Sequence, residues 1–194
     1  MPRTIDFDRD EALLKAMMLF NEKGYTACSI QNLLNTMGLN PGSLYAAFGD
    51  KRSLYLEALT LYEQFSVEQF ETFLLAGDSP IQNIHAFFNM TFLEMNEEIL
   101  RAGCFLVNTI VEMTDLDQEL VDIAGSKLDR LEIALKNTLI RAQEIGGLSK
   151  DKDPVAISQF LLSTIKGLRI TCKQIQDREV INNIIRTALM ILND

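Results

Sequence analysis

The residues of this 194-residue chain that could carry enzyme or metal chemistry are few: three cysteines, at positions 28, 104 and 172, and one histidine, His85. A nucleophilic enzyme needs a nucleophile beside a base, and a zinc site needs several closely placed ligands. One histidine and three widely spaced cysteines supply neither, and the sequence holds no Gly-x-Ser-x-Gly or phosphate-loop motif. We therefore expect no enzyme, no metal site and no resident cofactor.

A second group of polar side chains, Asn40, Ser43, Tyr45 and Lys51, is crowded around one predicted helix start. Their amide, hydroxyl and ammonium groups can donate to phosphate oxygens, and the N-terminus of a helix itself attracts phosphate. Lys51 also falls in the first turn of the next helix, where the helix dipole disfavours a cation and a nearby phosphate would remove that penalty. The alternatives are that Tyr45 packs on the first helix and that Lys51 is only a solvated charge.

Two short predicted helices, 29–37 and 41–48, hold these side chains. Ser29 and Asn40 are suitable N-caps, and Gly38 lies where a tight turn needs a residue free to adopt positive φ. This pattern predicts a helix-turn-helix, a motif that pushes the N-terminal end of its second helix into the major groove. An ordinary αα-corner is the alternative. Five apolar residues are spaced to bury the helix crossing: Leu33, Met37, Leu39, Leu44 and Phe48.

The rest of the chain has helical periodicity and turn signals, with no sustained alternation typical of strands, so we expect an all-α fold. The segment 104–113 is apolar on almost all sides, which predicts a centrally buried helix. The expected organisation is a DNA-binding domain over 1–52 and a larger helical domain over 53–194. The nine expected helices span about 8–23, 29–37, 41–48, 50–75, 81–100, 104–113, 118–145, 151–175 and 178–192.

The net charge of −9 does not suggest a nucleic-acid binder, but the acid is unevenly distributed. Residues 1–55 contain six basic and six acidic side chains, whereas residues 56–194 contain 12 basic and 21 acidic ones. The acidic excess therefore lies outside the helix-turn-helix. With no apolar leader and no run long enough to span a bilayer, we expect a cytoplasmic protein with reduced thiols and no membrane partner.

Over about its first 60 residues the sequence resembles the TetR family of bacterial transcriptional regulators. The matching residues are Phe20, Gly24, Tyr25, Gly38, Gly42, Ser43, Leu44, Tyr45, Phe48 and Lys51. The resemblance implies a homodimer, a palindromic double-stranded DNA operator and a small-molecule effector. By position it implies a DNA-binding surface made of Thr26, Ser29, Asn40, Pro41, Gly42, Ser43, Tyr45, Ala46 and Lys51.

Two departures from the family pattern concern this surface. Leu34 stands where many members have a small residue, which affects how the two helices cross. Ala46 and Ala47 stand where larger polar or aromatic residues are common, so the helix offers few hydrogen bonds to base edges. An alanine methyl can still contact a thymine methyl.

The phenylalanines and methionines of the segment 87–113 are either plain core or the lining of a ligand cavity. Asn108 and Thr109 favour a cavity, because a buried polar group needs a partner from a ligand, a water or a carbonyl. His85 is either a pocket-lining group or a surface residue. The predicted effector site comprises His85, Phe88, Phe92, Met95, Phe105, Asn108, Thr109, Met113, Phe160 and Thr164.

We expect a ligand-responsive DNA-binding regulator, a repressor that dimerises through the apolar helices at 151–175 and 178–192. An effector would push the helix that follows the motif and change the separation of the two recognition helices. One alternative is a redox or electrophile sensor using Cys104, although a free cysteine in an apolar helix is usually a small core residue. Another is a helical ligand-binding or scaffolding protein whose helix-turn-helix is only structural.

Overall fold

The computed structural model describes residues 7–193, and within that range the chain forms helices and no strand. The expected all-α fold is confirmed. Arg3 and Asp6, which the sequence places in the predicted DNA-binding domain, and Asp194 at the other end lie outside the described residues.

The N-terminal part of the fold is a three-helix unit that ends at Phe48. Its helices begin at side-chain caps: Ser29 forms a capping box with Asn32, and Asn40 accepts the Ser43 N–H at 2.9 Å. Gly38 ends the second helix in the left-handed region, at φ 70° and ψ 30°, as predicted. The three helices are α1 (Arg9–Lys23), α2 (Ile30–Met37) and α3 (Pro41–Phe48).

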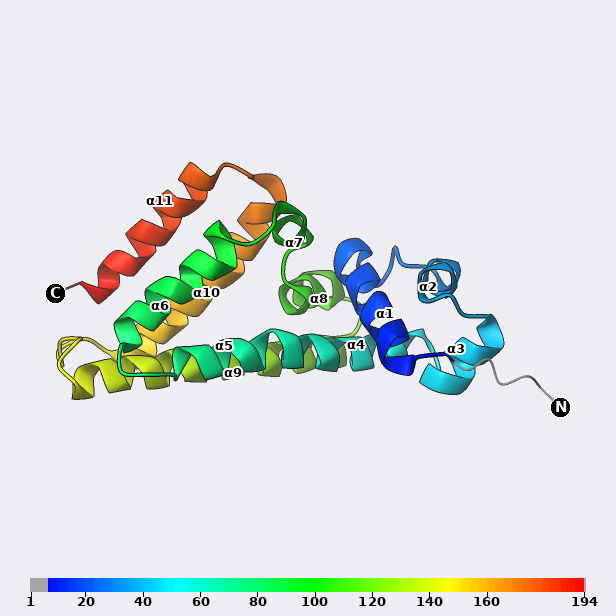
Figure 1. Cartoon of the computed structure of the whole chain (residues 1–194), viewed down its shortest axis with the longest axis horizontal. Coiled ribbons are helices and arrows are strands. Elements are labelled where there is room, and N and C mark those ends of the chain that lie inside the picture. The colour runs from blue at the N-terminus through cyan, green and yellow to red at the C-terminus, as the bar shows by residue number, and fades with distance from the viewer. Residues whose placement is uncertain (1–6, 194) are drawn as a thin grey trace.

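The larger part of the fold is a helical body (Figure 1). Its helices are α4 (Lys51–Phe65), α5 (Val67–Leu74), α6 (Pro80–Phe88), α7 (Glu97–Ala102), α8 (Phe105–Met113), α9 (Gln118–Glu144), α10 (Pro154–Gln174) and α11 (Arg178–Leu189). A π-helix, Asn89–Leu93, follows α6, and a 3-10 turn, Met190–Leu192, follows α11.

Two of the expected helices are each divided in the structure. The helix expected over 50–75 is interrupted at Ser66, whose N–H donates to both Tyr62 O and Glu63 O before α5 begins. The helix expected over 81–100 widens into the π-helix, closed by Glu94 N–H donating to Asn89 O at 3.0 Å. Neither break has a proline or glycine to signal it, so the helical periodicity of the sequence predicted one continuous helix in each case.

The long helix α9 runs along one side of the body and packs against α5, α6, α8 and α10. Figure 1 shows α4 and α5 running alongside α9, with α1–α3 at one end of the molecule and α10–α11 towards the other. The expectation that the helix 104–113 is buried on all sides is wrong at one position, because Val111 is 66% exposed. The predicted boundary after residue 52 falls in the first turn of α4, which contacts both α1 and α9.

Candidate nucleic-acid interface

The helix-turn-helix is held by the apolar residues that its spacing predicts. Leu33, Met37, Leu39, Leu44 and Phe48 are all buried. Leu34, the first departure from the family pattern, is buried too, and its carbonyl accepts the N–H of Gly38 and of Leu39. The larger side chain is thus part of the crossing itself.

The outward face of α3 carries the residues predicted to contact DNA. Asn40, Pro41, Gly42 and Ala46 are exposed, Ser43 is half-buried, and Tyr45 is 49% exposed. The Asn40 side-chain oxygen is occupied by its cap, as is the Ser29 hydroxyl, which accepts from Asn32 N–H at 3.1 Å. The Ser29 hydroxyl also donates to Asn32 Oδ1, whereas the exposed Tyr45 hydroxyl has no hydrogen-bond partner among the described residues and can donate to a phosphate.

Lys51 is more than a solvated charge, because its ammonium group holds the loop between α1 and α2. Its Nζ donates to Tyr25 O at 2.6 Å and lies 4.3 Å from the centroid of the Tyr25 ring. The positive charge at the start of α4 is thus fixed beside Thr26, another predicted phosphate contact. The Thr26 side chain is exposed, so the two residues form one edge of the candidate interface.

Sequence reasoning missed Glu112, a body residue that holds the same loop from the opposite side. Its carboxylate accepts the N–H groups of Tyr25 and Thr26 at 2.8 and 2.7 Å. Gly24 lies so close that an added Cβ would be 2.6 Å from Glu112 Oε2, and its φ of +80° also disfavours a side chain. An acidic residue in an otherwise apolar helix was the only signal in the sequence.

A buried aromatic cluster joins the DNA-binding unit to the body. Tyr55 of α4 stacks edge-on against Phe20, Tyr25 and Phe105, with centroid distances of 4.8 to 5.0 Å. Its hydroxyl lies 2.8 Å from Thr109 Oγ1. Burial raises the pKa of the Tyr55 phenol, so the group remains a neutral hydrogen-bonding partner. Tyr55 thus connects α8, α4 and the α1–α2 loop through direct contacts.

Three ion pairs link α4 to α1 and to the start of α9. Arg52 binds Asp117 at 2.8 Å and Glu119 at 2.7 Å, at the start of α9. The hydrogen bond from Arg52 lowers the pKa of the Asp117 carboxyl. Arg9 binds Glu57 at 2.7 Å. These partners neutralise cations that would otherwise be available to DNA.

The predicted effector residues fall into three separate places. Phe88, Phe92, Phe105, Thr109 and Met113 are buried in the core, with Met95 packed against it. His85 lines a polar pocket of about 730 Å³ between α6 and α11. Phe160 and Thr164 line a different, apolar groove of about 470 Å³ between α10 and α11. The structure does not bring these three sets together.

Asn108 and Thr109 have protein partners. Asn108 Nδ2 donates to Ala102 O at 2.8 Å and to Asn21 Oδ1 at 3.1 Å, and Thr109 Oγ1 donates to Phe105 O at 2.8 Å. Backbone carbonyls and side chains of the protein thus supply the hydrogen-bond partners that these two polar groups need. Asn108 is thus part of the junction between α1 and α8, and Thr109 is part of the junction between α4 and α8.

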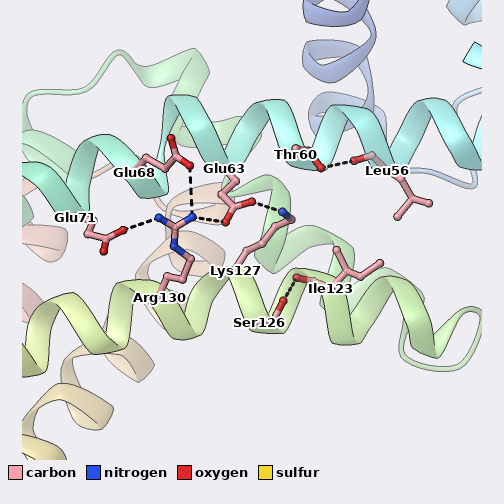
Figure 2. Close-up of polar contacts among 9 residues, drawn as sticks. All are labelled: Leu56, Thr60, Glu63, Glu68, Glu71, Ile123, Ser126, Lys127 and Arg130. Carbon is pink, nitrogen blue, oxygen red and sulfur yellow. Dashed lines mark hydrogen bonds and ion pairs between the residues drawn. The ribbon is translucent and has the colours of Figure 1, made fainter.

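The other end of α4 is fixed to α9 by a cluster of ion pairs around Glu63 (Figure 2). Glu63 pairs with Lys127 and, at 2.8 Å, with Arg130. Arg130 also reaches Glu71 of α5 at 2.7 Å, so it spans the break at Ser66. Figure 2 shows the Arg130 guanidinium between the carboxylates of α4 and α5.

Within the described residues, no group of three or more His, Cys, Asp or Glu side chains could hold a metal ion. In the same part of the chain, no helix is long and apolar enough to cross a membrane.

A helix-turn-helix presented at one end of a helical body defines a DNA-binding regulator. Residues 12–58 match the model described as bacterial regulatory proteins, tetR family, and residues 80–188 match the tetracyclin repressor-like C-terminal domain. The chain belongs to the TetR family of transcriptional regulators and is not an enzyme.

Full-length relatives and a solved complex agree with this assignment. The chain is 27% identical over 194 residues to YezE of Bacillus subtilis, an uncharacterized HTH-type transcriptional regulator, covering 100% of both chains. It is 27% identical over 186 residues to the transcriptional repressor ComR of Escherichia coli, covering 95% of this chain and 89% of ComR. A cysteine mutant of the regulator CifR, complexed with 26-bp double-strand operator DNA, is similar at a TM-score of 0.87 and 26% identity, over 96% of this chain and 97% of CifR.

Proposed function

We propose that the chain is a dimeric repressor that binds a palindromic operator through α3 and leaves it when a small molecule binds the body. The observation that carries this proposal is the outward face of α3, where the half-exposed Tyr45 stands beside residues predicted to contact phosphate. The operator complex of CifR and the repressor ComR support the same function. The predicted domains 1–52 and 53–194 then correspond to DNA binding and control, and a regulator of chromosomal genes works in the cytoplasm.

The proposed dimer interface is formed by α10 and α11. Their shared groove is lined by Phe160, Thr164, Val180, Ile184 and Ala188. Phe160 is 45% exposed. A contiguous apolar groove of this kind is unfavourable in water unless a partner covers it. A two-fold dimer would present two copies of α3 at the fixed spacing that successive major grooves require.

The contacts of α8 with the α1–α2 loop supply a mechanism for release. Glu112 and Asn108 hold the DNA-binding unit from α8, and Thr109 holds Tyr55 of α4. An effector that displaces α8 would shift α4 and the loop together. The distance between the two recognition helices would change, and operator and effector would weaken each other's binding.

A mobility-shift assay with DNA flanking the protein's own gene tests this function. The wild type should form a salt-sensitive complex that an unrelated duplex does not form. Tyr45→Ala should weaken binding about tenfold or more, because a hydrogen bond to a charged phosphate is worth about 1.5–3 kcal/mol. Tyr45→Phe, which removes only the hydroxyl, is the matched control and should show most of that loss. Unchanged affinity in both variants would contradict the assigned docking face.

A second candidate keeps the DNA binding but makes Cys104 the input. Cys104 is the N-cap residue of α8, and α8 is the helix that holds the α1–α2 loop. Its burial limits access by an oxidant. Mass spectrometry after mild oxidant treatment, with Cys104→Ser as control, distinguishes the candidates: modification of Cys104 that releases the operator supports sensing, and an unmodified thiol excludes it.

A further inference from the structure

Arg169 of α10 is the most deeply buried arginine among the described residues, at 6% exposure, and it has no counterion there. Its Nη1 reaches only the Met95 sulfur, at 3.9 Å, which is a weak acceptor. The better exposed Arg9, Arg52 and Arg130 each bind a carboxylate. These three arginines thus have carboxylate partners, whereas the buried Arg169 is left without an oxygen acceptor.

The surroundings of Arg169 are apolar on the side of the π-helix. The guanidinium carbon lies 5.1 Å from the centroid of the Phe92 ring, and Met95 covers its Nη1. Arg178 is not free to bind an anion in place of Arg169, because its two terminal nitrogens donate to Phe92 O and Met95 O at 2.5 and 2.8 Å. Arg178 instead fixes the backbone segment that faces Arg169. A guanidinium with unmatched donors against a fixed apolar wall is unfavourable unless an anion joins it.

Thr91 provides an independent observation in the same π-helix. It is 1% exposed, and its Oγ1 is the one buried side-chain oxygen or nitrogen among the described residues without a hydrogen-bond partner. Helical threonines elsewhere in the chain donate to the carbonyl four residues earlier, as Thr109 and Thr138 do. The widened turn at Asn89–Leu93 leaves the Thr91 hydroxyl without such a bond. A π-helical turn inside an α-helical protein is often found at a functional site.

We propose that Arg169 binds the carboxylate of a small organic monoanion whose apolar part lies against Phe92 and Met95. One guanidinium matches one negative charge and can receive a carboxylate through two parallel hydrogen bonds. Lys173, one turn further along α10, is already bonded to Ala102 O and Asn108 Oδ1, so it is not free to be the second partner that a dianion such as a phosphate monoester needs. This inference rests on the proposed function, since it names the chemical class of the effector.

The site adjoins the route to the DNA-binding unit. Lys173, one turn further along α10, holds Asn108 of α8. An anion on Arg169 would therefore alter the packing of α10 against α8, the helix that holds the α1–α2 loop through Glu112.

Thermal unfolding of the full-length protein with a defined set of probes tests the proposal. Butanoate, hexanoate and octanoate are compared with their uncharged primary amides at about 10 mM and constant ionic strength, because a ligand that binds only the folded state raises the Tm. Arg169→Met removes the charge at similar volume, and Arg169→Gln is a second variant that keeps polarity. Arg186→Met is the matched control, because Arg186 is an exposed arginine beside His85 in the polar pocket.

We expect at least one carboxylate to raise the Tm of the wild type while its amide does not. Both Arg169 variants should weaken that binding at least tenfold, and Arg186→Met should leave it unchanged. Without a probe, Arg169→Met should unfold at the wild-type temperature or above, because it removes an uncompensated buried charge. A Tm several degrees lower in both Arg169 variants would show a structural role and overturn the proposal. Equal shifts by acids and amides, loss of binding in Arg186→Met, or no shift with any carboxylate would also overturn it.

Operator binding separates this inference from the proposed function. Wild type and Arg169→Met should bind the operator equally without a probe, and the stabilising carboxylate should weaken only the wild-type complex. If neither protein binds operator DNA, the proposed function fails whatever the Tm shows. If both bind and no carboxylate changes the binding, only the assignment of Arg169 fails.

Discussion

The two ends of α4 are held by ion pairs that differ in their exposure to solvent. At the DNA-binding end, Arg52 pairs with Asp117 and Glu119, and all three side chains are at least a quarter exposed. At the other end, Glu63 and Lys127 pair with only 11% and 13% of their side chains exposed. Exposed pairs are screened by water and salt, whereas breaking a buried pair leaves an uncompensated charge. We infer that the body end of α4 is an anchor and that the DNA-binding end is the more easily displaced of the two.

Loss of Glu63 should have the largest effect. Glu63→Ala leaves Lys127 buried without its partner, and we expect a loss of about 3 kcal/mol in the free energy of unfolding, measured by urea denaturation. Arg130 keeps Glu71 and Glu68, so the damage should be confined to Lys127. The double variant Glu63→Leu with Lys127→Met should recover most of the stability. A single variant as stable as the wild type would show that the cluster is no anchor.

Lowering the pH should weaken the same ion pairs around Glu63. Burial raises the pKa of Glu63, but the hydrogen bonds from Lys127 and Arg130 outweigh it and leave the pKa below its usual value. The stability from Glu63 is therefore present above the pKa of an unfolded glutamate, about 4.3, and is lost as pH falls through the lower folded-state value. Urea titrations should show the stability gap between wild type and Glu63→Gln closing in that acidic range. A gap that is constant with pH would contradict the assigned ion pairs.

The sequence predicted the helix-turn-helix better than it predicted the contacts made by the helical body. Ser29, Asn40 and Gly38 act through the backbone next to them, so their caps and turn follow from local spacing. Glu63 and Lys127 are 64 residues apart, and Glu112 holds a loop 86 and 87 residues away. Such partners are set by how helices pack, and nothing in the local pattern specifies them.

The breaks at Ser66 and in the π-helix escaped prediction for a related reason. Both segments have continuous helical periodicity, and the break depends on contacts made after the chain has folded: Arg130 spans the first, and Arg178 binds the carbonyls of the second. Arg169 could not be found either, because a single arginine in an amphipathic helix resembles any surface cation until its burial is known.

Removal of the Glu112 carboxylate should have an intermediate effect, close to the DNA-binding end of α4. Glu112→Ala leaves two N–H groups of the α1–α2 loop without their acceptor, and we expect about 1–2 kcal/mol of lost stability. Hydrogen exchange should locate the loss in the loop around Tyr25 and Thr26 rather than in α9. Glu112→Gln, which keeps one acceptor oxygen, should lose less. Protection unchanged throughout the loop would show that α8 does not hold it.

Lys51→Met should have a smaller effect on stability, and its main effect should be on DNA binding. The ammonium group is fixed on Tyr25 O beside the candidate phosphate contacts, so its loss should lower the slope of log affinity against log salt by about one. Lys51→Arg keeps the charge and should keep the slope. Fluorescence anisotropy across a salt series measures both. An unchanged slope in Lys51→Met would place this lysine away from the DNA.

Arg52→Gln should have the smallest effect, because its partners are exposed. Urea denaturation should show a slight loss of stability at low salt that disappears at high salt, whereas the loss in Glu63→Ala should persist in both. The same substitution should make the DNA-binding end of α4 easier to displace, so that less effector is needed to release the operator. If Arg52→Gln instead destabilised the protein as much as Glu63→Ala at high salt, both ends of α4 would be anchors. The shift of α4 could then not transmit the signal.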